Sequence, residues 1–133
     1  MPSARLLARA LVLASALTFA GAAPSAIAGP DRAAALVDAA KKTFDANEKL
    51  LESGRATAES VYVWSVRWLD AERDRPAKGR ALAAAFEAHR DRMVALHDRL
   101  KAMVDQGIAS TSDLAATDYF VLEAEQWLAR KKH

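Results

Sequence analysis

The chain has 133 residues, of which 52% are hydrophobic and 27% are charged, and it contains no cysteine. This length suits a single domain with one modest core. The absence of cysteine excludes a disulfide framework and cysteine lipidation, so a folded domain must be stabilised by packing.

The first 28 residues have the pattern of a cleaved secretory signal peptide. Arg5 and Arg9 supply a positive start, residues 10–23 are apolar, and residues 26–28 (Ala-Ile-Ala) supply a small-x-small cleavage pattern. An uncleaved anchor helix is the alternative, but the apolar stretch is short for a membrane span and Pro24 interrupts it. We therefore expect a periplasmic or secreted mature chain, residues 29–133, with no transmembrane segment.

Removal of the signal peptide changes the charge balance. The whole sequence has 19 Lys and Arg against 17 Asp and Glu, and two of the basic residues (Arg5, Arg9) but none of the acidic ones precede residue 29. The mature chain thus carries 17 of each, a net charge of zero. The only basic cluster, residues 130–133, ends a predicted helix, where the helix dipole favours cations. We therefore expect no nucleic-acid binding.

Helical periodicity runs through residues 29–133, and no alternating strand pattern is present. A first helix is expected from about Asp31, as N-cap, to about Ser53, with Gly54 ending it in a left-handed conformation. A second helix should begin at Thr57 and end in the linker at residues 73–79, which contains a proline.

The third helix, from about residue 80 to Gly107, has the clearest pattern. Its apolar positions alternate spacings of four and three over three heptads, which predicts coiled-coil-like packing against neighbouring helices: Leu82, Phe86, His89, Met93, Leu96, Leu100 and Met103. The fourth helix opens with Ser110-x-x-Asp113, a capping box, and continues to the C-terminus.

The mature sequence is an internal repeat. A shift of 53 residues places Gly54 and Thr57 on Gly107 and Ser110, and residues 69–72 (Leu-Asp-Ala-Glu) on residues 122–125 (Leu-Glu-Ala-Glu). This match indicates duplication of one helix–turn–helix unit. We predict an all-α fold of two tandem antiparallel hairpins, residues 31–73 and 80–131. They should form an elongated up-down-up-down four-helix bundle or coiled coil, most simply a closed one.

The repeated pattern G-x-x-[ST]-x-x-[DE]-[VL], followed by an apolar helix ending in L-x-A-E, resembles the hairpin turns of TolC-type outer-membrane efflux proteins. It stands here from Gly54, with Ser60 at the acidic position, and again from Gly107. In that family two hairpins form a periplasmic α-helical tunnel, assembled as a trimer, whose tips meet an adaptor protein. Such proteins also carry β-strands of an outer-membrane barrel, and we expect no segment of this sequence to form those strands. The resemblance thus implies fold, export and association through the turns, but not transport by this chain alone.

Sequence signals for catalysis are lacking: there is no G-x-S-x-G, no phosphate-binding loop and no H-E-x-x-H. We therefore expect a non-enzymatic protein without a cofactor. Carboxylates on apolar helix faces require partners, and the ordinary expectation is an ion pair with the first or third helix, or exposure at a helix end. The alternative is a divalent-cation site formed by Glu72, His89, Asp118 and Glu125.

The second helix is apolar around much of its circumference, which is typical of a central helix or of an interface. Trp68 is expected in the core, and Tyr62 and Trp64 are the candidate interface residues. The sequence therefore predicts an exported helical-hairpin protein that acts by protein–protein association in the cell envelope, with a protein partner or as a homo-oligomer. The alternative function is a small periplasmic metal- or ligand-binding helical bundle.

Overall fold

A computed structural model describes residues 29–76 and 79–131 of the chain, so the predicted signal peptide lies outside the described residues. Four helices account for nearly all of this part: α1 (Gly29–Glu52), α2 (Ala58–Arg73), α3 (Arg80–Asp105) and α4 (Thr111–Lys131). No strand occurs in these two ranges. The predicted all-α fold of four helices is confirmed.

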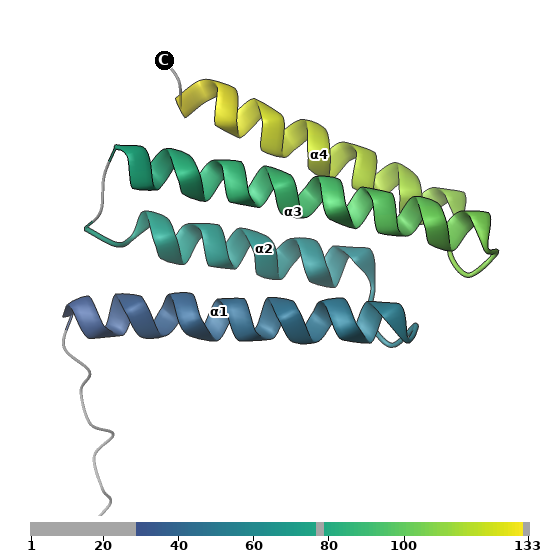
Figure 1. Cartoon of the computed structure of the whole chain (residues 1–133), viewed down its shortest axis with the longest axis horizontal. Coiled ribbons are helices and arrows are strands. Elements are labelled where there is room, and N and C mark those ends of the chain that lie inside the picture. The colour runs from purple at the N-terminus through teal and green to yellow at the C-terminus, as the bar shows by residue number, and fades with distance from the viewer. Residues whose placement is uncertain (1–28, 77–78, 132–133) are drawn as a thin grey trace, which may run out of the picture.

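The helices lie side by side in chain order, each antiparallel to the one before it (Figure 1). The most extensive contacts join α1 to α2 and α3 to α4, and α2 packs on α3 to unite the two hairpins. A smaller contact joins α2 to α4, whereas the backbone of α1 closely approaches neither α3 nor α4 within the described ranges. The bundle is therefore open rather than closed, with α1 and α4 as its outer helices.

The turns of the two hairpins have the same geometry, as the repeat predicts. Gly54 and Gly107 have φ angles of +70° and +73°, the left-handed conformation that glycine adopts at little cost. The helix ends form the same pair of backbone hydrogen bonds, typical of a Schellman motif, at 2.8–2.9 Å. In the first turn, the N–H groups of Gly54 and Arg55 donate to the carbonyl oxygens of Leu51 and Leu50. In the second turn, 53 residues later, the N–H groups of Gly107 and Ile108 donate to those of Val104 and Met103. Both predicted helix stops are confirmed.

The caps that follow the two turns are also as predicted. Thr57 caps α2, and its hydroxyl accepts the backbone N–H of Ser60 at 3.1 Å. Ser110 and Asp113 form the reciprocal capping box, with N–H donors at 3.1 and 3.2 Å from the side-chain acceptors. The hydrogen bonds from Ser110 lower the pKa of Asp113.

The start of the first helix differs from the prediction. Helix α1 already includes Gly29, so Asp31 lies inside its first turn and the prediction of Asp31 as N-cap is wrong. A proline is tolerated in the first helical turn because its missing N–H would have no intrahelical partner there. Asp31 still complements the positive end of the helix dipole.

The core lies mainly between the hairpins and consists of two clusters. The larger one extends toward the turns, and the smaller one, near the linker, contains Leu69, Ala85, Phe86 and Leu128. Of the core positions predicted for α3, five are buried and Leu82 and Met103 are half-buried. The predicted packing face of α3 is therefore confirmed.

Candidate functional site

A polar cluster of two fully buried residues and the half-buried Arg92 lies where α2 packs on α3. Ser65 and His89 have no solvent-exposed surface, and their Oγ and Nδ1 atoms are 2.8 Å apart. Arg92, one turn along α3 from His89, donates its Nε–H to Ser65 Oγ at 2.7 Å. A longer bond of 3.4 Å joins Arg92 Nη2 to the Ser65 carbonyl oxygen. These contacts tie the second helix of one repeat to the first helix of the next.

The direction of these bonds fixes the protonation of His89. Because Ser65 Oγ already accepts from Arg92, its own hydrogen is left to donate to His89 Nδ1, which places the imidazole proton on Nε2. That Nε2 atom is buried and has no hydrogen-bond partner among the described residues. The imidazole ring instead stacks on the Trp127 ring of α4, with 5.5 Å between centroids. The cluster thus connects α2, α3 and α4.

Burial controls the ionisation of the cluster. Desolvation, and secondarily the charge of Arg92, lowers the pKa of His89 to about 4, so the imidazole is neutral at neutral pH. Burial also lowers the pKa of Arg92, to about 10, which leaves the guanidinium charged. This charge lies 4.0 Å from the centre of the Trp68 ring and 5.6 Å from that of Phe44 on α1. Cation–π contacts, the Ser65 bonds and neighbouring carboxylates offset part of the cost of its desolvation.

A serine paired with a histidine is also the arrangement of a nucleophile with its base. Here both side chains are fully buried, so a substrate has no access to Ser65 Oγ without separation of α2 from α3. The cluster is suited to fix the contact between the two hairpins rather than to catalyse a reaction. One sign of this cluster is visible in the sequence, where Ser65 shares the apolar face of the second helix. The hydrogen bonds of Arg92 to Ser65 were not predicted.

The predicted interface residues of α2 are partly occupied within the chain. Tyr62 stacks on Phe120 of α4 at 4.1 Å, and its hydroxyl donates to Glu123 at 2.5 Å. Burial, followed by this hydrogen bond, raises the pKa of Tyr62 above its usual value. Trp64 is half-buried, and the Arg67 guanidinium lies over it, 4.5 Å from the centre of the Trp64 ring. Trp68 is half-buried as well, so the two tryptophans do not divide into a core and a surface residue.

The four residues of the alternative metal site do not come together. Glu72 accepts a hydrogen bond from the Trp68 indole at 3.0 Å, Asp118 lies 2.9 Å from His97, and Glu125 is exposed. His89 is enclosed with Ser65 and Arg92. Across residues 29–76 and 79–131, no group of three or more His, Asp and Glu side chains is placed to hold a metal ion.

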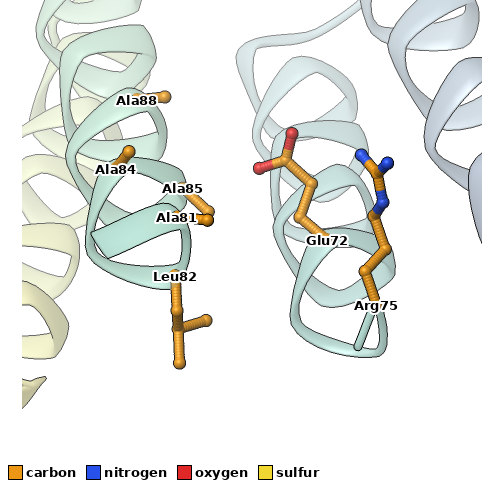
Figure 2. A pocket seen from close by; sticks show the side chains of 7 residues that line it. All are labelled: Glu72, Arg75, Ala81, Leu82, Ala84, Ala85 and Ala88. Atoms are coloured by element: carbon orange, nitrogen blue, oxygen red, sulfur yellow. The ribbon is translucent and has the colours of Figure 1, made fainter. Parts of the chain in front are cut away.

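Glu72 also borders a depression of about 380 Å3 between the end of α2 and the start of α3. In Figure 2, Glu72 and Arg75 lie across the depression from Leu82 and a wall of alanines on α3. The alanines offer neither hydrogen-bonding nor ionisable groups. This depression therefore has a single carboxylate and a single guanidinium as its functional groups.

The outer helices expose large apolar side chains. Leu122 on α4 is 65% exposed, whereas Leu69, its counterpart in the first repeat, is 1% exposed and belongs to the core. Together with Val94, Val121 and the polar residues His97, Asp118 and Glu125, Leu122 lines an open groove of about 480 Å3 between α3 and α4. On the opposite outer helix, Leu36 is 52% exposed.

The two turns meet at one end of the molecule. They jointly line a small depression of about 160 Å3, to which Gly54 and Ala56 contribute from one turn and Ile108 and Ala109 from the other. Ile108 is 61% exposed and takes the place of Arg55 in the repeat. The predicted turn and cap residues are thus brought together at a common end, with an exposed apolar side chain beside them.

No protein-family model matches the chain, and neither does any curated protein or solved structure. The resemblance to TolC-type proteins therefore stays a prediction. Among the helices described above, none has a stretch long and apolar enough to cross a membrane.

Proposed function

We propose that this protein is exported and acts without catalysis in the cell envelope, by protein–protein association through its helical hairpins. The observation that carries the proposal is the exposure of Leu122 on outer helix α4, where the matching Leu69 of the first repeat is buried against the second hairpin. A helix face that is covered in one repeat and uncovered in the next is suited to bind a further helical surface.

Two other features support the proposal. The groove beside Leu122 is lined by three apolar and three polar side chains, and association surfaces commonly combine the two kinds. The common end of the hairpins adds Ile108 as a second exposed apolar residue. The export step rests on the signal-peptide pattern of residues 1–28. The alternative of a metal-binding bundle lacks a ligand cluster in the described ranges.

Site-specific photocrosslinking in the native envelope tests this function. A photoreactive amino acid in place of Leu122 should give a discrete crosslink to a protein, either a partner or a second copy. The same amino acid in place of Asp98, whose side chain is 73% exposed on α3, is the matched control and should not. A strictly monomeric protein that gives no discrete crosslink from Leu122 or Ile108 would contradict the proposal.

A further inference from the structure

A second depression, at the opposite end from the turns, has a different chemical character. It has a volume of about 320 Å3 and is formed by three helices: Asp70 and Arg73 of α2, Phe86 of α3, and Trp127, Arg130 and Lys131 of α4. Its aromatic side chains come from the smaller core cluster, in which Phe86 is buried and Trp127 packs against it. The depression thus has an apolar floor that the core holds in place.

Cations surround this aromatic floor. The Arg73 guanidinium lies 5.9 Å and the Lys131 ammonium 5.5 Å from the centre of the Phe86 ring. Arg130 adds a third positive charge to the rim, and Asp70, which pairs with Arg73 at 3.0 Å, is the one carboxylate of the lining. The formal charge of the lining side chains is therefore three positive against one negative, a net of two positive.

The helix ends do not cancel this charge. Helices α2 and α4 both terminate beside the depression, and each C-terminus contributes about half a negative charge. Subtraction of both leaves a net charge of roughly one positive. An anion is consequently favoured over a cation at this place, and the guanidinium groups can bind a carboxylate or phosphate through paired N–H donors.

We propose that this depression, defined by the six residues above, binds a small organic anion: a carboxylate or phosphate monoester carried on an aromatic or short apolar body. The apolar body would lie against the half-buried Trp127, above the buried Phe86, and the anionic group would meet Arg130 and Lys131. The volume is at the lower end of the range for ligand pockets, which limits the body to about one or two rings. This site is separate from the association surface and does not rest on the proposed function.

Calorimetric titration with matched probes tests the proposal. 2-Naphthoate and 2-naphthyl phosphate should bind, and the neutral 2-naphthalenemethanol should bind about tenfold more weakly or not at all, because a charge-assisted hydrogen bond contributes about that factor. In NMR spectra, the Trp127 indole N–H should shift on addition of naphthoate, with a Trp127→Phe variant assigning the signal. Equal binding of the acid and the alcohol, or no binding of either anion at millimolar concentration, would overturn the proposal.

Charge-removal variants locate the site. The Arg130→Ala/Lys131→Ala double variant should weaken naphthoate binding about tenfold or more. The control variant Lys42→Ala/Lys49→Ala removes the same charge from exposed positions of α1 and should leave binding unchanged. An equal loss in both double variants would show non-specific attraction and refute the site. Sedimentation with phosphatidylglycerol vesicles, without binding of either free naphthyl anion, would also refute it, since the proposed ligand is a small free anion.

Discussion

Acidification should destabilise this protein through His89. The folded chain holds the imidazole neutral down to a pKa of about 4, whereas an unfolded histidine has a pKa of 6.5. Between these values the unfolded state binds a proton that the folded state does not, so the free energy of unfolding falls as the pH falls. The contribution is complete above about pH 6.5 and is lost progressively as the pH approaches 4.

The magnitude follows from the two pKa values. Their difference corresponds to about 3 kcal/mol at the acidic limit, of which about 2 kcal/mol is already lost at pH 5. The loss is a substantial part of the free energy of unfolding of a small domain, which is typically about 5–15 kcal/mol. The physical cause is the complete burial of the ring beside a charged Arg92, with no carboxylate bonded to it among the described residues.

Urea unfolding at pH 7 and pH 5 measures this loss. The His89→Asn variant is the matched control, because its amide oxygen can accept from Ser65 but does not titrate. Other histidines and all carboxylates are shared by the two proteins, so the difference between their pH dependences isolates His89. Identical pH dependences for the wild type and the variant, or an NMR titration in which His89 protonates near pH 6.5, would refute the reasoning.

Three further predictions concern stability in urea unfolding. Ser65→Ala removes the acceptor of Arg92 and the donor to His89, and it should lower the free energy of unfolding by about 2–4 kcal/mol. The control Ser53→Ala, at an exposed serine, should change it by less than about 0.5 kcal/mol. Equal losses in the two variants would show that the buried cluster adds no stability. Gly54→Ala and Gly107→Ala should each lower the free energy of unfolding by a similar amount, about 1 kcal/mol. The cause is the positive φ of both residues, since nothing lies within 4 Å of an added Cβ. A neutral variant would exclude the left-handed turn at that position. Trp68→Ala should lower the free energy of unfolding by about 3 kcal/mol, the lower end for tryptophan because the ring is half-exposed. A stability equal to wild type would show that the contacts of this ring with Phe44, at 5.7 Å between ring centres, and with Arg92 are unimportant.

The local features of this fold could be predicted because each depends on residues close in sequence. The turn glycines interact with carbonyl groups of the helix that they end, and Ser110 interacts with Asp113. Each of these interactions lies within one or two helical turns of the chain. The core face of α3 was predictable because a regular spacing of apolar residues fixes which side of a helix is buried. With Asp31 as N-cap, the sequence predicts a first helical residue three positions after Gly29, where α1 begins, because capping signals do not fix a helix end to the residue.

The contacts between hairpins were less predictable because they depend on which helices become neighbours. The repeat assigns Leu69 and Leu122 to equivalent positions, yet one is core and the other is exposed, since α2 has a neighbour on either side and α4 is an outer helix. For the same reason Asp118, expected on an apolar face, is mostly exposed and lies against His97. The pairing of Ser65 with Arg92 could not be read from either helix alone.

The open arrangement of helices also bears on how the protein loses structure. The backbone of α1 packs on α2 alone, and α1 reaches α3 through side chains such as Glu48, which pairs with Arg99 at 3.0 Å. Detachment of α1 would therefore leave the contacts among α2, α3 and α4 in place, and partial opening should require less free energy than global unfolding. Amide hydrogens of α1 should accordingly exchange with solvent faster than those of α3. Because most packing joins helices adjacent in sequence, folding should also be fast, with each hairpin able to form before the two associate.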